Sequence, residues 1–353
     1  CALPICQDDC RQAWDREFPD RVRVDAFRAR VDRDGPLLAR ISNSARMLGA
    51  GIATLLAPRR IDVLYLFTYP PGIAGAMILL CRMFRRRTRI IFSFQDNLEY
   101  RIRNPVLRFL YRRYNAFCIT HATTTIVLSA EMRDHLLESV RRGRRETVSR
   151  RLEVVNNFYA EQTEPPDDPA EKHYDIIYAG NHGPGQNLDH FIEALARCAG
   201  AAPPKVVFYG GGTAKPALMA LAAQRGVAID FRAPVDRRQI AAEIRRSRYG
   251  LVAMRPDLPK YAFPSKIIAY TSNGTPTLLM CAPGGTLARW ISDEGLGEAI
   301  DACDPERAAC DIDRVFAAAD ATTPRDVALR AARLFGRDLF LERLGLILDR
   351  GTP

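Results

Sequence analysis

Apolar residues recur along the chain in two alternating forms, short continuous runs and longer stretches that suit helices. Continuous runs of the buried parallel-strand type lie at 62–67, 89–94 and 124–129. An apolar helix ending near Phe84 and a basic helix over Pro105–His121 are predicted between them. This alternation is typical of α/β domains built on a parallel sheet, which is the fold class that we predict.

A polar, proline-bearing stretch at 161–174 interrupts the pattern, which then restarts. We therefore predict two domains, residues 1–160 and 175–325, joined by that linker. Helices over 326–353 follow, and we expect them to pack back toward the first domain. Within the second domain the pattern predicts strands at 175–180, 205–209, 228–231, 249–254 and 277–280, and helices at 188–199 and 236–246.

The positive charge of the chain is concentrated in its first half. The net charge is +10, and residues 1–160 hold 28 arginines and no lysine against 16 acidic residues. Arginines gather at 82–89 and again at 101–113. This asymmetry indicates an anionic partner for the first half, either a membrane surface or a nucleic acid, and the alternative is a solvated arginine-rich surface.

The composition disfavours several other classes of protein. The nine cysteines are scattered with no Cys-x-x-Cys pair and no nearby histidine cluster, so we expect no metal site and reduced cytosolic thiols. No stretch approaches the roughly 20 apolar residues of a membrane span, and no signal peptide is recognisable. We therefore expect a cytoplasmic protein, with peripheral attachment to the inner membrane face as an option.

The segment Phe263-Pro264-Ser265-Lys266 combines a proline stop with a helix start that carries a hydroxyl and a lysine. A helix start offers unpaired backbone N–H groups and the positive end of the helix dipole, which suit a phosphate or diphosphate. Gly274 closes the short helix, and Pro276 leads into the next apolar strand. Taken alone, the segment fits an ordinary capped helix equally well.

Three further loops of the second half follow strands and carry suitable chemistry. They lie at 180–187, 210–212 and 255–263, and glycines in the first two allow a backbone to approach a ligand closely. Ligands of open parallel sheets bind at the carboxyl ends of the strands, in such loops. Together with the helix start at 264–266, these loops indicate a nucleotide-diphosphate site.

Three segments of the second half, 177–189, 207–212 and 263–276, resemble the family-4 glycosyltransferases. The resemblance of 69–72, 93–96 and 154–158 in the first half is looser. The likeness is greatest to bacterial enzymes that build surface polysaccharides on lipid-linked acceptors. It implies the GT-B fold, in which two Rossmann-like domains face each other across a cleft, and retaining transfer of a sugar from a UDP- or GDP-sugar without an essential metal or other cofactor.

The resemblance assigns the first domain to the acceptor and the second to the donor. It gives Asp96 as the catalytic candidate, an orienting group or general base at the end of the strand Arg89–Phe94. The positions that it implies for donor binding are Gly180, Asn181, His182, Gly183, Gln186, Gly211, Gly212, Arg255, Lys260, Phe263, Pro264, Ser265 and Lys266.

The chain departs from the family pattern at several of these positions. Tyr261 and Ala269 stand where many members carry glutamates that contact the donor, and Gln186 replaces a lysine that often binds diphosphate. We find no histidine after the strand Arg89–Phe94. The residues before 21 look helical, so we expect the first domain to lack its first strand and glycine loop.

These departures leave an alternative open, a catalytically inactive GT-B subunit that binds other components of a polysaccharide assembly complex. A nucleic-acid-binding protein is suggested only by the arginines, and nothing in the chain resembles a known nucleic-acid module. The sequence therefore favours a glycosyltransferase with a nucleotide-sugar donor and a lipid-linked saccharide acceptor, and no nucleic-acid partner.

Overall fold

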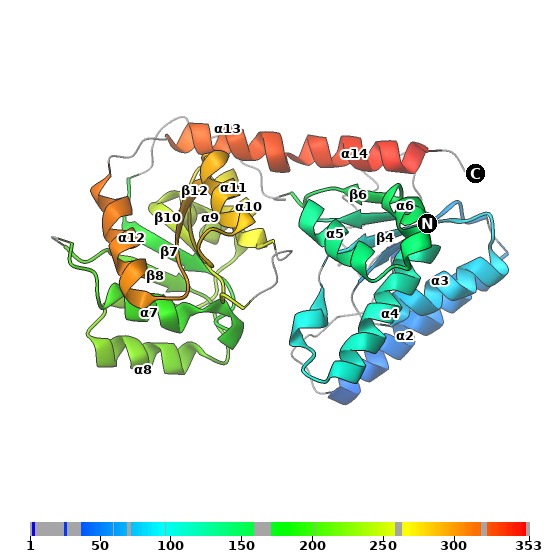
Figure 1. Cartoon of the computed structure of the whole chain (residues 1–353), viewed down its shortest axis with the longest axis horizontal. Helices are drawn as coiled ribbons and strands as arrows, with labels where there is room; N and C mark the ends of the chain where they lie inside the picture. Colours follow the sequence, from blue (N-terminus) through cyan, green and yellow to red (C-terminus); the bar gives the residue numbers. More distant parts are fainter. Residues whose placement is uncertain are drawn as a thin grey trace. The chain divides into compact units, whose positions relative to one another are not determined.

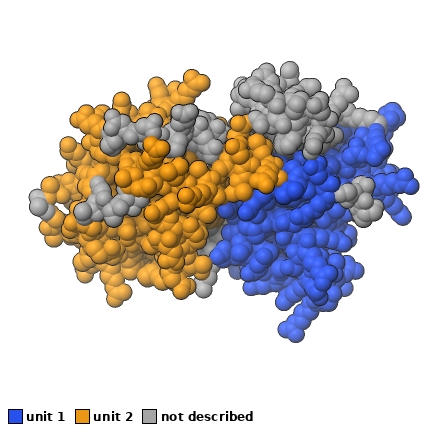
Figure 2. Space-filling model, turned by 90° about the horizontal axis from the view of Figure 1, so that it is seen from above, with its two compact units in different colours: residues 1–156, 343–353 blue, residues 157–342 orange. Residues whose placement is uncertain are grey.

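The computed structural model describes residues 2–3, 25–26, 37–58, 60–68, 72–95, 97–158, 171–200, 202–257, 263–318 and 323–350. The chain forms two compact units, which Figure 2 shows in different colours. The first unit comprises residues 1–156 together with 343–353, and the second comprises residues 157–342. Each unit contains one parallel sheet of six strands, so the chain has the α/β class expected from its alternating pattern.

The sheet of the first unit has the strand order β2-β1-β3-β4-β5-β6. Its centre is β4 (Arg89–Phe94), whose six residues are all buried, between β3 (Val63–Phe67) and β5 (Thr124–Val127). The other strands are short, namely β1 (Ala2–Leu3), β2 (Asp25–Ala26) and β6 (Leu152–Val154). All neighbouring strands are parallel, with Leu64 opposite Ile90 and Ile91 opposite Thr124.

The expectation that the first domain lacks its first strand is wrong. Ala2 and Leu3 form β1, which pairs with β2 and β3 and so stands inside the sheet. A two-residue strand is too short to show alternation of apolar and polar positions, and sequence patterns therefore miss it. The two residues of β2 lie within 21–27, where apolar and polar positions alternate, and the remainder of that range lies outside the described residues.

Helices of the first unit pack in sequence order. They are α2 (Leu37–Leu56), α3 (Ile73–Phe84), α4 (Pro105–His121), α5 (Ala130–Glu138) and α6 (Arg145–Ser149), with the 3-10 turns η1 (Leu98–Arg101) and η2 (Arg142–Arg144). The helices α2, α3 and α4 lie side by side (Figure 1). The start of α4 is set by Asn104, whose side chain accepts hydrogen bonds from the N–H groups of Val106 and Leu107, and by Pro105 in the first helical position.

The last helix of the chain completes the first unit. This helix, α14 (Arg337–Asp349), begins in the second unit, and its residues from Arg343 onward belong to the first. Arg89, buried at the start of β4, donates to the carbonyl oxygens of Leu348 (2.6 Å) and Ile347 in the last turn of α14. A buried guanidinium thereby satisfies carbonyl groups that a helix end leaves unpaired.

The sheet of the second unit has the order β12-β11-β10-β7-β8-β9. Its strands are β7 (Tyr174–Ala179), β8 (Val206–Tyr209), β9 (Ile229–Arg232), β10 (Ser247–Ala253), β11 (Thr277–Cys281) and β12 (Gly297–Asp301), all parallel. The order reverses between β7 and β10, since the strands after β7 add on one side and those from β10 on the other. Such a switch point is where open α/β sheets bind ligands, at the carboxyl ends of the strands.

Two helical layers cover this sheet. Apolar side chains of α7 (Leu188–Leu195), α8 (Lys215–Arg225) and α12 (Pro305–Ala317) form one core with Tyr178 of β7. Ile177 of β7 points to the opposite core, which is formed by α9 (Arg237–Arg245), α10 (Ser265–Ser272), α11 (Thr286–Asp293) and α13 (Pro324–Phe335). None of the helices that the structure describes is both long and apolar enough to cross a membrane.

Candidate functional site

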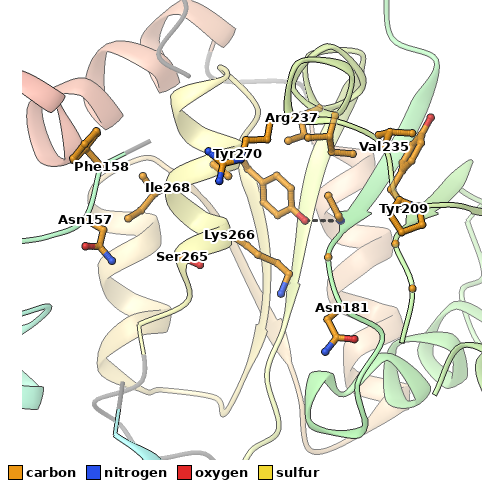
Figure 3. A pocket seen from close by; sticks show the side chains of 18 residues that line it. Asn157, Phe158, Asn181, Tyr209, Val235, Arg237, Ser265, Lys266, Ile268 and Tyr270 are labelled. Atoms are coloured by element: carbon orange, nitrogen blue, oxygen red, sulfur yellow. Dashed lines mark hydrogen bonds between the residues drawn. The ribbon is translucent and has the colours of Figure 1, made fainter. Parts of the chain in front are cut away.

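A cavity of about 700 Å³ opens in the second unit at the carboxyl ends of β7 and β8 (Figure 3). Its walls come from the loops after these strands, from the start and middle of α9, and from α10. The lining residues are Asn157, Phe158, Ala179, Gly180, Asn181, Tyr209, Gly210, Gly211, Pro234, Val235, Arg237, Ile240, Ile244, Ser265, Lys266, Ile268, Ala269 and Tyr270. All of them belong to the second unit, so the cavity is built by this unit alone.

The loops after β7 and β8 are held against each other by their backbones. The N–H group of Gly180 donates to the carbonyl of Tyr209 at 3.0 Å, and that of His182 to the carbonyl of Gly211 at 2.8 Å. Gly210 has φ of +139°, and a Cβ atom there would lie 2.0 Å from the carbonyl oxygen of Gly180. Only glycine permits this close approach, which keeps the cavity wall thin at this point.

The helix start predicted at 264–266 is present as the first turn of α10. Pro264 is extended (ψ 117°) and Ser265 is the first helical residue, with its hydroxyl toward solvent and no side-chain cap on the turn. The first N–H groups of a helix lack intrahelical acceptors, so this end of α10 offers donors to the cavity. Gly274, with φ of +75°, follows the helix in the left-handed conformation that its C-terminal end requires.

Lys266 extends from α10 toward the loop that carries Asn181 (Figure 3). Its Nζ atom donates to Oε1 of Gln186 at 2.9 Å and lies 5.1 Å from the ring centroid of Tyr178. Burial of the ammonium group lowers the pKa of Lys266 to about 8. The side chain is therefore a partly desolvated cation with two neutral partners and no carboxylate among its recorded contacts.

Tyr270 ties α10 to the central strands of the sheet. Its hydroxyl accepts a hydrogen bond from the N–H group of Ala179 at 2.9 Å, drawn in Figure 3, and donates to the carbonyl of Leu251 at 3.2 Å. Its ring fills the space over Gly250, where a Cβ atom would lie 2.2 Å from Cγ of Tyr270. These contacts fix the position of α10, and therefore of Lys266, relative to β7 and β10.

The remaining wall combines apolar and polar groups. Val235 and Ile240 contribute apolar surface beside α9, and Arg237 of the same helix lines the cavity near Tyr270. Tyr209 is oriented by Arg232, whose guanidinium donates to the Tyr209 hydroxyl at 2.6 Å. One side of the cavity can thus pack against a flat apolar group, while the side at α10 can hold an anion.

Comparisons with known proteins identify this architecture. Residues 5–150 match the family model of the glycosyl transferase 4-like domain. The chain is similar to the solved structure of Anabaena HepE in complex with UDP (13% identity, TM-score 0.67, covering 98% of this chain and 90% of that one). It is similar to sucrose-phosphate synthase from Thermosynechococcus elongatus (14% identity, TM-score 0.66, covering 92% of this chain and 82% of that one). It is also similar to the lipopolysaccharide outer core galactosyltransferase WaaB (13% identity, TM-score 0.60, covering 93% of this chain and 84% of that one).

The chain has the GT-B fold, and its residues 5–150 match a glycosyl transferase 4-like domain, which supports a glycosyltransferase. Both the family-4 resemblance and the GT-B fold that were read from the sequence are confirmed by these comparisons. No curated protein sequence matches this glycosyltransferase, so its donor and acceptor have to be argued from its own residues.

Five of the predicted donor-binding residues line the cavity of the glycosyltransferase, namely Gly180, Asn181, Gly211, Ser265 and Lys266. Gln186 does not line it but supports Lys266, and it also accepts a hydrogen bond from the Tyr178 hydroxyl at 3.2 Å. The residue that replaces a cationic position of the family therefore holds another cation in place. Ala269 lines the cavity, so a methyl group occupies the wall where the family pattern suggests a carboxylate.

His182 is placed away from the cavity lining. Its side chain is fully buried, and its ring lies against those of Tyr178, Phe208 and Phe231. Nδ1 lies 3.3 Å from the carbonyl oxygen of Gly211, while Nε2 has no hydrogen-bond partner. Burial lowers the pKa of His182, so the ring is neutral near pH 7. In this geometry the imidazole packs behind the glycine loops and does not face a ligand.

The other predicted donor residues are also spread around the cavity rather than in it. Phe263 packs against Trp290 and Phe335, and the exposed Arg255 pairs with Asp257 at 3.1 Å. Gly183, Gly212 and Pro264 adjoin lining residues without lining the cavity themselves. Asp96, Lys260 and Tyr261 lie outside the described residues, so their predicted roles stay predictions.

Sequence reasoning missed a polar cluster in the first unit, after β4. Glu99 accepts a hydrogen bond from Nε2 of His135 at 3.0 Å, and Nε of Arg112 lies 3.6 Å from its other oxygen. Asn97 fixes this turn by accepting from the N–H group of Glu99 at 3.1 Å. Glu99 and His135 are separated by 36 positions. The cluster anchors the segment that continues from the carboxyl end of β4, and spacing along the sequence gives no sign of it.

Proposed function

We propose that this glycosyltransferase moves a sugar from a nucleotide-diphosphate sugar to a saccharide acceptor carried on a lipid or a growing polysaccharide, with retention of the anomeric configuration. The observation that carries the donor side of the proposal is the position of Lys266, whose ammonium faces the cavity beside the start of α10. A diphosphate needs a cation and convergent N–H donors, and both are present there.

The cavity supports a division of labour along the donor. Lys266 and the first turn of α10 would hold the diphosphate, while Val235 and Ile240 would pack against the base. Transfer breaks the bond between the anomeric carbon and the diphosphate oxygen, an acceptor hydroxyl oxygen bonds to that carbon on the same face, and the hydroxyl proton passes to the departing diphosphate. Negative charge then grows on the leaving diphosphate, where a preorganised cation and helix dipole stabilise it more than the ground state.

UDP is the nucleotide that we test first, because the similar Anabaena structure is a complex with UDP. The assay is isothermal titration with UDP, GDP and their sugar conjugates. Lys266→Ala is expected to weaken binding at least tenfold, since it removes a charge-assisted contact worth roughly 1.5–3 kcal/mol. The matched control is Lys205→Ala, an exposed lysine that precedes β8 at the opposite end of the strand from the cavity.

Equal nucleotide affinity in the wild-type chain and the Lys266→Ala variant would overturn the assignment of the diphosphate to α10. The stereochemical part is tested separately, by the anomeric configuration of the product in proton NMR. A product with inverted configuration would contradict retention while leaving the donor site in place.

One observation favours a second candidate, a binding subunit without transferase activity. Ala269 presents a methyl group to the cavity, so the described wall around it offers no carboxylate at that position to hold donor hydroxyls. Titration and turnover separate the two candidates. Binding of a sugar nucleotide without hydrolysis or transfer to any saccharide acceptor would favour the binding subunit.

A further inference from the structure

The start of α4 projects from the first unit as an exposed apolar surface. Val106, Leu107, Phe109 and Leu110 each expose between 55% and 63% of their area. In the second unit, Met219 and Leu329 are exposed singly, which is ordinary for a protein surface, and a smaller exposed group, Leu79, Met83 and Phe84, lies at the C-terminal end of α3. Four within five consecutive positions form a patch, and such patches mark interaction sites. We call these four residues the α4 patch.

The exposure of the patch follows from how α4 packs. The Tyr114 hydroxyl accepts a hydrogen bond from the N–H group of Gly75 in α3 at 3.1 Å, and Arg82 of α3 donates to the carbonyl of His121. Both contacts join residues 39 positions apart, so α3 and α4 run parallel in a fixed register. Pro105 therefore lies about 13 Å along the axis before Tyr114, ahead of the first residue of α3. The first two turns of α4 extend beyond their neighbour.

These two turns are amphipathic. At roughly 100° per residue, the four apolar side chains cover an arc of about 160°, and Arg108 falls on the other side. Arg108 is held there by hydrogen bonds to the carbonyls of Ile102 (3.2 Å) and Arg103 (3.4 Å). Asn104 and Pro105 fix the helix start, so the patch sits on a rigid element.

The charges on α4 itself are all positive, and the carboxylate of Glu99 beside this helix is paired with Arg112. Residues 100–130 contain five arginines and no aspartate or glutamate, and of these Arg103, Arg108 and Arg113 are exposed. A protein partner would require acidic groups for this rim and a complementary hollow for the projecting side chains. An anionic bilayer meets both features at once, since phosphates lie above hydrocarbon at the depth that a protruding helix end reaches.

We propose that the α4 patch is a membrane-docking element that inserts into the interface of a bilayer containing anionic lipid, with the exposed Arg113, which falls within the same arc of the helix, on the headgroups. The patch lies at the carboxyl edge of the first sheet, because α4 follows the carboxyl end of β4 through η1. Docking by this end brings that edge of the first unit to the lipid surface. The proposal does not rest on donor binding, which the second unit provides.

The test is co-sedimentation of the full chain with vesicles of phosphatidylcholine alone or mixed equally with phosphatidylglycerol. Binding to the mixed vesicles is expected. Phe109→Ser with Leu110→Ser should weaken it at least tenfold at both low and high salt, because apolar insertion is lost. Arg113→Gln should weaken it roughly fivefold at low salt and little at high salt, whereas Arg108→Gln, on the opposite side of the helix, should weaken it less. Met219→Ser with Leu329→Ser, in the second unit, is the matched control and should bind as the wild type does.

A conservative variant reads insertion directly. Phe109→Trp keeps an aromatic side chain at the patch, and its fluorescence should shift to shorter wavelength when anionic vesicles are added. Failure of the wild type to bind mixed vesicles would overturn the proposal, as would wild-type binding by the Phe109→Ser, Leu110→Ser variant. A dimer that this variant dissociates, without any vesicle binding, would instead assign the patch to a second copy of the chain. UDP titration of each variant shows that loss of lipid binding is not loss of the donor site.

Discussion

Lys266 is a cation placed where burial disfavours its charge. The pKa of Lys266 is lowered to about 8, and its recorded partners, the Gln186 amide and the Tyr178 ring, are neutral. A diphosphate that enters the cavity would supply the missing negative charge. The desolvation of the ammonium then strengthens the pairing, because an ion pair away from water is attracted more strongly. The side chain therefore forms its strongest electrostatic interaction only when the ligand is bound.

This arrangement predicts that nucleotide affinity depends on pH. Above about pH 8 the free site loses the Lys266 proton, so UDP affinity should fall by about tenfold for each further pH unit until the ligand can no longer restore the proton. Titration calorimetry between pH 6.5 and 9.5 measures the slope. Lys266→Arg stays charged throughout this range and should give a flat profile. A wild-type profile as flat as that of the arginine variant would contradict the prediction.

The stability of the ligand-free chain should change in the opposite sense. Between about pH 8 and 10.5 the unfolded chain keeps the lysine proton that the folded chain has released. The unfolded state then binds more protons, so this residue's contribution to folding stability rises with pH across the window. Melting temperatures of the ligand-free wild type, compared with Lys266→Met, isolate this contribution.

At the scale of single residues, the sequence predicts several of the positions that line the cavity but not what each side chain does. Ser265 and Lys266 could be predicted because a proline stop and a helix start are local signals. Neither the contact between Gln186 and Lys266, across 80 positions, nor the burial of His182 among aromatic rings has a local signal. Both depend on how β7, β8 and α10 meet, and only the packed structure shows that.

At the scale of elements, the hydroxyl of Tyr270 links α10 to the sheet through two hydrogen bonds. Tyr270→Phe removes the hydrogen-bond partner of the Ala179 N–H group, which is partly buried, and of the Leu251 carbonyl, which is buried. We expect a loss of about 1–3 kcal/mol in the free energy of unfolding, measured by urea denaturation. Tyr174→Phe is the control, because its partly exposed hydroxyl bonds Arg232 at the sheet edge and water can replace it. Equal losses in the two variants would contradict the assigned role.

The elements themselves could be predicted where caps and apolar runs coincide. Helix α4 begins and ends as predicted, because Asn104 and Pro105 mark its start and a new apolar run follows its end. Helix α11 and strand β12 were not predicted. The strand Gly297–Asp301 is only half buried and contains a glutamate, so its sequence lacks the continuous apolar run of a central strand. The strand conformation of these residues is stabilised by pairing with β11.

At the scale of the whole molecule, two separate cores predict two unfolding transitions. Each unit has its own six-stranded sheet, and the helix α14 is the element that crosses from one to the other. UDP at a hundredfold excess over its dissociation constant should raise only the transition of the second unit, by about 2.7 kcal/mol of stabilisation. Differential scanning calorimetry with and without UDP tests this. A single transition that UDP shifts as a whole would show that the units unfold together.

The division into two α/β halves follows from the restart of the apolar pattern, and the sequence therefore predicts it. We expected the last helices to pack back toward the first domain, and residues 343–353 belong to the first unit. The contact that joins them to it, from the side chain of Arg89 to the last turn of α14, has no local signal in the sequence. The excess of positive charge in the first half can be counted from the sequence. The exposure of the α4 patch cannot, because it depends on α4 extending past α3.

The hydrogen bonds between Arg89 and the end of α14 can form only late in the synthesis of the chain. Leu348 is synthesised 259 residues after Arg89, so the buried guanidinium has to wait for its acceptor while the whole second unit is being made. The second unit can fold as soon as its residues have left the ribosome. The first unit, although its synthesis begins first, is completed last because it includes residues 343–353. A nascent chain stopped short of residue 347 lacks both carbonyl oxygens that accept from Arg89, so the guanidinium has to keep its hydrogen bonds to water until these residues are made.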